Sequence, residues 1–285
     1  MPDPSSQFDG ASETTEVVGT TGVAQLRRVW AAASNPKAHV LVLHGVAEHS
    51  GRYEHVGASW VKAGFSARSF DHVGHGRSGG KRGHVDSFDV FLDDIEANLT
   101  DLRTNGLPVV LMAHSLGGLM ALAYCESDRP APDVLLLSGP ALGAEIKTWR
   151  RVGAPVLGRA VPTLFVKAEF HGDLLSTDPD VGARYEADPL RVHGQTAGLG
   201  KAVLGAMKTT NANLSKISIP TMVVHGGMDR IVPAHFSEPV GDLPVATRRE
   251  LPGLAHEVLN EPSWRETMQS YVNFTNGALG LTPEG

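Results

Sequence analysis

Cysteine is nearly absent from this sequence: its 285 residues include only Cys125. A disulfide within the chain is therefore excluded, and the fold does not depend on an oxidising compartment. The first 18 residues also lack the basic start and the apolar stretch of a secretory signal peptide. From these two absences we expect a cytoplasmic protein.

Long apolar runs and an excess of basic charge are missing as well. The longest apolar candidate, residues 152–166, is interrupted by Arg159 and by two prolines, so we expect no membrane span. Lys and Arg together number 25 against 31 Asp and Glu, which gives a net charge of −6. Because proteins that bind nucleic acid usually present a basic face, nucleic acid is not an expected partner.

What the sequence does contain is an alternation of strand patterns and helical patterns. Continuously apolar runs such as "HVLVLHG" and "PVVLMAH" are typical of strands covered on both faces. Apolar residues at helical spacing follow Ser87, a candidate N-cap. The pattern predicts an α/β fold with a mostly parallel central sheet, helices on both faces and an antiparallel opening. The expected strands are residues 14–18, 22–32, 39–45, 65–71, 108–114, 133–139, 219–226 and 246–253.

One long stretch breaks this alternation. Residues 140–217 carry helical patches, glycines and prolines but no clear buried strand. An insertion of this length between two strands usually forms a lid over the strand ends, where open α/β sheets bind ligands. We therefore predict a core of residues 13–139 and 218–285, a helical cap of residues 140–217, and a disordered tail of residues 1–12.

The segment "AHSLG" places Ser115 between an expected buried strand and an expected helix. It resembles the nucleophile elbow G-x-S-x-G, a sharp turn that exposes a serine hydroxyl above a sheet. Ala113 replaces the first glycine, a mild departure if its backbone has negative φ, while Gly117 is retained. The alternative is that Ser115 only caps the helix.

Two distant residues favour the nucleophile. Asp229 and His256 each follow an expected strand, in the order Ser, Asp, His that this kind of fold uses. A serine nucleophile needs a base, and the base needs a carboxylate that orients it. The backbone amides of Leu116 and Val46 are the expected donors to the developing oxyanion.

Further motifs resemble the monoacylglycerol lipase (serine aminopeptidase S33-like) family of the α/β-hydrolases. They are "HGVAEHSGRYEHV", "DHVGHGRSGG", "AHSLGG", "HGGMDRIVP", "GLAHEVLNE" and the cap piece "YEADPL". The resemblance covers the chain from about residue 15. It implies an α/β-hydrolase fold and hydrolysis of monoacylglycerols to fatty acid and glycerol, with no metal or other cofactor. The alternatives are a carboxylesterase or lysophospholipase acting on other single-chain esters, or a non-catalytic binding protein on the same fold.

A substrate with one apolar tail and a polar head needs an apolar tunnel that ends in a few polar groups. Apolar cap residues are candidates for the tunnel, although internal packing would explain about half of them. By resemblance, the glycerol could be held by Glu48, Arg52, His114 and Tyr185; for the first two, a structural ion pair is the alternative. The candidate substrate-binding residues are Glu48, Arg52, His114, Tyr185, Leu157, Leu164 and Phe165.

The 13 histidines do not form a metal motif. "HGVAEH" is one residue too long for the H-x-x-E-H zinc pattern, and His72 and His75 have no carboxylate at ligand spacing. We therefore expect these histidines to order loops. The expected partner is a small lipid ester; transient contact of the cap with a membrane surface stays open, and no pattern indicates an oligomeric state.

Overall fold

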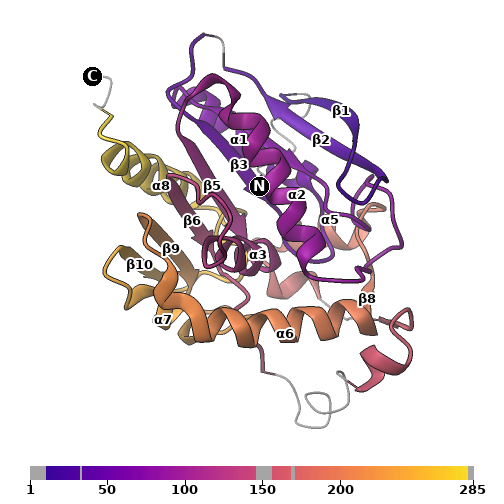
Figure 1. Cartoon of the computed structure of the whole chain (residues 1–285). Helices are drawn as coiled ribbons and strands as arrows, with labels where there is room; N and C mark the ends of the chain where they lie inside the picture. The colour runs from indigo at the N-terminus through magenta and orange to yellow at the C-terminus, as the bar shows by residue number, and fades with distance from the viewer. Residues whose placement is uncertain (1–10, 33, 146–155, 168–170, 282–285) are drawn as a thin grey trace.

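The centre of the protein is a sheet of eight strands with the order β1-β2-β4-β3-β5-β6-β9-β10 (Figure 1). The computed structural model describes residues 11–32, 34–145, 156–167 and 171–281. The strands of this sheet are β1 (Glu13–Val18), β2 (Ala24–Trp30), β3 (His39–Leu43), β4 (Ser66–Phe70), β5 (Val109–His114), β6 (Val134–Ser138), β9 (Thr221–Gly226) and β10 (Ala246–Leu251).

The strand directions agree with the expected α/β architecture. β2 runs antiparallel to both β1 and β4, whereas β4, β3, β5, β6, β9 and β10 pair in parallel. The apolar strands β5 and β6 lie in the middle, and every residue of both is buried. Their carboxyl ends therefore meet at one edge of the sheet, close to the residues that follow them.

Helices cover both faces of the sheet and form two apolar cores. One core contains side chains of α2, α3 and α6, including Phe91, Leu119 and Leu199. The other contains side chains of α1 and α8, including Trp60 and Trp264. The helices with eight or more residues are α1 (Glu54–Lys62), α2 (Asp89–Leu102), α3 (Leu116–Cys125), α5 (Pro179–Ala187), α6 (Ala197–Asn213) and α8 (Trp264–Ala278).

The start of α2 differs slightly from the expectation. Phe88, not Ser87, occupies the N-cap position, and the helix begins at Asp89. The Ser87 hydroxyl still accepts a hydrogen bond from the Asp89 amide at 3.2 Å. The predicted capping oxygen is thus present, one residue before the cap position.

The expected insertion leaves the sheet after β6 and returns at β9. Its described part includes α5, α6 and an antiparallel pair of short strands, β7 (Phe165–Lys167) and β8 (Gly194–Thr196). These strands were not expected, because three residues are too few to show a period. α6 lies along α3, and its Leu199 is fully buried in the core (Figure 1).

Most of the predicted tail, residues 1–10, lies outside the described residues. Ser12, at its end, accepts a hydrogen bond from Arg28 at 2.6 Å and donates one to Glu54 at 2.6 Å. In the described part of the chain, no helix combines the length and the hydropathy that crossing a bilayer requires.

Candidate active site

Ser115 occupies a strained turn between β5 and α3. Its backbone has φ 51° and ψ −115°, and Ala47 is the only other described non-glycine residue with positive φ. Such conformations cost of order 1–3 kcal/mol and persist where the surroundings impose them. The Ser115 side chain makes no capping hydrogen bond to α3. The alternative that Ser115 serves only as a helix cap is therefore not supported.

Two glycines after Ser115 allow this turn to pack closely. A Cβ atom on Gly117 would lie 2.6 Å from the carbonyl oxygen of His44, and one on Gly118 would lie 2.9 Å from Cα of Pro140. Both contacts are too short for any side chain. Ala113 has no such problem, because it lies within β5 and its φ is not positive.

Asp229 and His256 form a buried pair at the carboxyl ends of β9 and β10. His256 Nδ1 donates to Asp229 Oδ2 at 2.6 Å. The other carboxylate oxygen accepts from the amides of Ile231 and Val232, each at 2.8 Å. Burial alone would raise the pKa of Asp229, but these donors and His225 outweigh it and hold the pKa well below its usual range. Asp229 is therefore a permanent anion that orients the imidazole.

His225, which was not among the residues expected from the sequence, also contacts Asp229. Its fully buried Nε2 lies 3.1 Å from Asp229 Oδ2 and 2.8 Å from the carbonyl oxygen of Val232. The Asp229 carboxylate thus receives two histidine donors on one oxygen. The only sequence signal was the position of His225 as the penultimate residue of its strand.

Ser115 and His256 line the same pocket, together with the loop after β3. Within the described part of the chain, the Ser115 hydroxyl makes no hydrogen bond to the His256 imidazole. In enzymes without bound substrate, the distance between nucleophile and base is often longer than a hydrogen bond. The lining residues are Gly45, Val46, Glu48, Arg52, Ser115, Leu175, Tyr185, Ile231, His256 and Glu257.

The two expected oxyanion donors lie beside this pocket. Val46 lines it, and Leu116 is the first residue of α3, whose first amides have no acceptor within the helix. Ala47, directly after Val46, has φ 63°, and its carbonyl oxygen accepts from the amide of Val192 in the cap at 3.3 Å. The loop that carries the Val46 amide is therefore fixed from the cap side.

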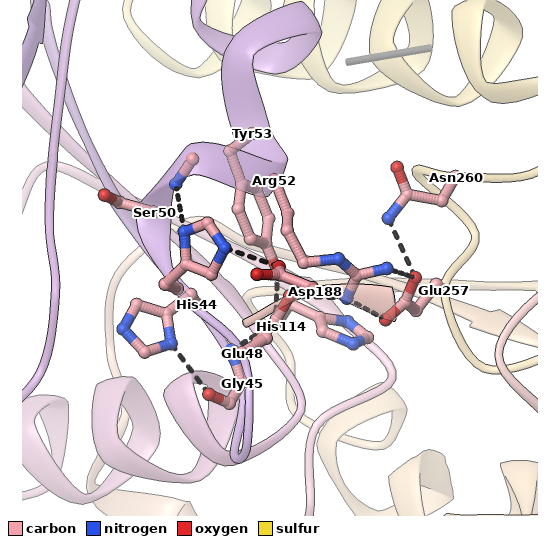
Figure 2. A network of polar contacts seen from close by, with 12 residues as sticks. His44, Gly45, Glu48, Ser50, Arg52, Tyr53, His114, Asp188, Glu257 and Asn260 are labelled. Atoms are coloured by element: carbon pink, nitrogen blue, oxygen red, sulfur yellow. Dashed lines mark hydrogen bonds and ion pairs between the residues drawn. The ribbon is translucent and has the colours of Figure 1, made fainter. Parts of the chain in front are cut away.

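Glu48 and Arg52 form an ion pair, and Arg52 also pairs with a second carboxylate, that of Glu257 (Figure 2). Arg52 Nη1 lies 2.8 Å from Glu48 Oε2, and its two terminal nitrogens lie 2.6 and 2.7 Å from the two oxygens of Glu257. Burial would raise the pKa of Glu257, but Arg52 outweighs it and lowers the pKa to about 2. Glu257 is the second residue that the sequence analysis missed, although it directly follows His256.

The remaining polar candidates lie around this ion-pair network. Glu48 Oε1 accepts from the Tyr53 hydroxyl at 2.8 Å. The Tyr185 ring lies 5.1 Å from the Arg52 guanidinium carbon. His114 Nδ1 donates to the Ser138 carbonyl at 3.0 Å, and burial lowers the pKa of His114 to about 3, so it is neutral near pH 7. Glu48, Arg52 and Tyr185 line the pocket, whereas His114 packs against His256 behind it.

The apolar candidates of the cap lie elsewhere. Leu157, Leu164 and Phe165 are exposed by 39%, 46% and 44% and do not line the pocket. Its apolar side chains come instead from Val46, Leu175 and Ile231. A tunnel through Leu157, Leu164 and Phe165 stays a prediction.

Among the described residues, no group of three or more His, Cys, Asp or Glu could hold a metal ion. The histidines of the two Gly-containing loops bond to backbone instead. His44 Nδ1 donates to the Gly45 carbonyl at 2.7 Å, and His72 Nε2 donates to the His44 carbonyl at 2.9 Å. His49 Nε2 pairs with Asp188 of the predicted cap at 2.7 Å.

Comparison with known proteins gives consistent matches across the chain. A profile of the family described as serine aminopeptidase, S33, matches residues 34–263. A monoacylglycerol lipase of Mycolicibacterium smegmatis is 36% identical over 265 residues, which cover 90% of this chain and 94% of that protein. A phospholipase of Bacillus subtilis is 31% identical over 86% of this chain and 97% of its own length.

The fold agrees with these matches. The crystal structure of Paleococcus ferrophilus monoacylglycerol lipase superposes with a TM-score of 0.82 at 29% identity, covering 90% of this chain and 99% of that one. The expected α/β-hydrolase fold is thereby confirmed, and so is the family indicated by the motifs. The protein is a hydrolase that belongs to the serine aminopeptidase S33 family.

Proposed function

We propose that this hydrolase cleaves the ester bond of monoacylglycerols, releasing fatty acid and glycerol through an acyl-enzyme intermediate. The observation that carries the proposal is the shared pocket of Ser115 and His256, with Asp229 bonded to the far side of the imidazole. The substrate class rests on the similarity to proteins named monoacylglycerol lipase. The pocket supports it, because apolar side chains and charged groups line one small space.

In the proposed mechanism, the Ser115 hydroxyl attacks the ester carbonyl while His256 Nε2 accepts its proton. The new negative charge on the carbonyl oxygen is received by the amides of Val46 and Leu116. His256 then protonates the leaving glycerol oxygen. A water molecule, deprotonated by the same imidazole, releases the fatty acid and restores Ser115, while Asp229 stabilises the imidazolium at both stages.

The glycerol end of the substrate is proposed to lie against Glu48, Arg52 and Tyr185. Arg52 already donates to two carboxylates, so the groups best placed to accept from a glycerol hydroxyl are carboxylate oxygens. His114 contributes indirectly, as a neutral ring that packs on His256 at 4.7 Å between centroids. The acyl tail is proposed to extend past Leu175 toward the cap, where Leu157, Leu164 and Phe165 would line its continuation if the cap rearranges around it.

Hydrolysis of matched lipid series tests this function. We expect the highest kcat/KM on monoacylglycerols, with diacylglycerols and lysophospholipids of the same acyl chain at least about tenfold lower, a difference of about 1.4 kcal/mol in transition-state binding. The measurement is release of fatty acid across short to long acyl chains, with Ser115→Ala as the blank. Equal or higher activity on lysophospholipids, or activity confined to short soluble esters, would contradict the monoacylglycerol assignment.

We further propose that exposed apolar residues of the cap contact the lipid aggregate that supplies the substrate. We also propose that the protein works in the cytoplasm. Val156 and Val161 are 63% and 44% exposed, on the same segment as the exposed Leu164 and Phe165. Each apolar side chain that inserts into a lipid surface adds to membrane affinity. The double variant Val156→Glu/Val161→Glu is therefore expected to lower the affinity for vesicles by at least about tenfold.

Cosedimentation with phospholipid vesicles measures this binding in a Ser115→Ala background. Val18→Glu is the matched control, because Val18 is 78% exposed but lies on β1, at the far edge of the sheet. Unchanged binding of the cap variant, or an equal loss in the Val18 variant, would argue against a contact through the cap.

A further inference from the structure

The polar end of the pocket has an unusual balance of charge. Its lining residues include two carboxylates, Glu48 and Glu257, and one guanidinium, that of Arg52. Arg52 is the only Lys or Arg among the described residues that line the pocket. All three side chains are buried, with residual side-chain exposures of 3%, 5% and 11% in that order.

The face of the Arg52 guanidinium formed by its two terminal nitrogens is already occupied by carboxylates. Arg52 Nη1 donates to both carboxylates and Nη2 donates to Glu257, so the fork of the guanidinium is already filled by a bidentate carboxylate (Figure 2). Tyr185 lies over the same guanidinium. A phosphate that took the two terminal nitrogens of Arg52 would displace Glu257, which would leave that buried carboxylate without its cation.

Glu257 is held as an anion. Besides Arg52, its Oε2 accepts from Asn260 Nδ2 at 2.8 Å, and its pKa is lowered to about 2. Burial raises the pKa of Glu48, but its partners are all donors, as a carboxylate requires. His114 is neutral near pH 7, so it adds no compensating positive charge. Arg191 packs on the outer ring Tyr185 at 4.7 Å but does not line the pocket.

We propose that Glu257 is a specificity-determining residue that excludes phosphate-bearing head groups and so restricts the pocket to uncharged glycerol esters. The inference rests on the proposed function, which it deepens by fixing the class of head group. A second negative charge brought next to Glu257 meets like-charge repulsion in a poorly solvated site, and Arg52, the one Lys or Arg among the described lining residues, is already paired with two carboxylates. An uncharged glycerol meets no such penalty and gains hydroxyl-to-carboxylate hydrogen bonds.

The test compares two substrates that differ only by a phosphate: 1-monoacylglycerol and 1-acylglycerol 3-phosphate with the same acyl chain. The quantity is the ratio of kcat/KM for the phosphate ester to kcat/KM for the neutral ester. We expect Glu257→Gln to raise this ratio at least about tenfold, because it removes one like charge from a partly screened site and leaves Arg52 with Glu48 as its remaining carboxylate partner. Glu257→Asp, which keeps the charge, is expected to leave the ratio within about twofold of wild type.

Glu16→Gln is the matched control for net charge, because Glu16 is exposed on the edge strand β1. It should leave the ratio unchanged. If Glu257→Gln keeps hydrolysing monoacylglycerol while the ratio stays at the wild-type value, the specificity role is wrong. If the wild-type enzyme does not hydrolyse monoacylglycerol at all, the proposed function itself fails, which is a separate and earlier observation.

A measurement on the wild-type protein decides the matter if Glu257→Gln does not fold. The second ionisation of a phosphate monoester has a pKa of about 6, so the phosphate ester gains about one negative charge between about pH 5 and about pH 8. Changes in the enzyme's own protonation that affect both substrates equally cancel in the ratio. We expect the ratio to fall severalfold over this range; a flat or rising ratio would overturn the proposal.

Discussion

Replacing Ser115 with alanine is expected to lower kcat for ester hydrolysis about 10⁶-fold, which leaves only the contribution of the remaining site. The substitution removes the oxygen that forms the acyl bond and leaves the strained turn in place, since alanine meets the same φ of 51°. Thermal unfolding should therefore change little, within about 1 kcal/mol. Steady-state hydrolysis of a monoacylglycerol measures the loss of activity.

A covalent serine probe separates loss of the nucleophile from loss of the fold. A fluorophosphonate should label the wild-type protein at the peptide that contains Ser115 and should not label the alanine variant. Ser270→Ala is the control, because Ser270 is a hydroxyl on the outer helix α8 that bonds Arg249 and its own helix. Wild-type activity in Ser115→Ala would exclude the proposed nucleophile.

Replacing Asp229 with asparagine is expected to reduce kcat about 10⁴-fold with little change in KM. The 2.6 Å bond from His256 Nδ1 then meets an amide, which either donates in the wrong direction or accepts without charge. The imidazole loses the tautomer that leaves Nε2 free to accept a proton from Ser115, and the imidazolium loses its counter-ion. The measurement is kcat and KM on a monoacylglycerol at several pH values.

Asp242→Asn gives the same change of composition at an exposed position after α7 (Glu238–Gly241) and should leave both constants unchanged. If Asp229→Asn retained near wild-type kcat, the orienting carboxylate would have to be another one. Glu257, adjacent to His256 in the chain, would then become the first group to test.

The central part of the site was predictable because its geometry follows from chain order. Ser115, Asp229 and His256 each follow a strand of a parallel sheet, and parallel strands bring their carboxyl ends to one edge. Gly117 was also predictable from the motif, since a Cβ atom at this position would lie 2.6 Å from the carbonyl oxygen of His44.

His225 and Glu257 were missed for a physical reason. Their roles depend on where a side chain points, and neighbouring residues of a loop have no fixed period that separates inward from outward positions. From the sequence, the carboxylate of Glu257 could equally point toward water or toward Arg52. Only the folded position of Arg52, 205 residues earlier in the chain, decides which of the two it contacts. The sequence suggested an ion pair between Glu48 and Arg52 as an alternative, but it gave no sign that Glu257 also pairs with Arg52.

The long segment between β6 and β9 was expected from the sequence, whereas its role as a cap stays a prediction. Leu157, Leu164 and Phe165 have the composition of a tunnel wall and lie at the surface in this structure. Composition cannot distinguish an apolar residue that faces a pocket from one that faces outward when the surrounding elements are short, as with β7 and β8.

The point where the cap enters and leaves the sheet has a consequence for how such enzymes diversify. β6 and β9 are paired neighbours, in register from Leu135 with Thr221 to Ser138 with Val224, although the whole insertion separates them in sequence. Because the two strands are parallel, the insertion leaves at the carboxyl end of β6 and re-enters at the amino end of β9. Its two ends are therefore held at a fixed separation by one pair of strands, and a longer or shorter excursion between them changes the entropic cost of closure only slowly with length. Recombination at this junction could exchange one cap for another without moving a strand, so lineages built on this sheet can acquire new substrates by replacing the excursion while the reacting groups stay where they are.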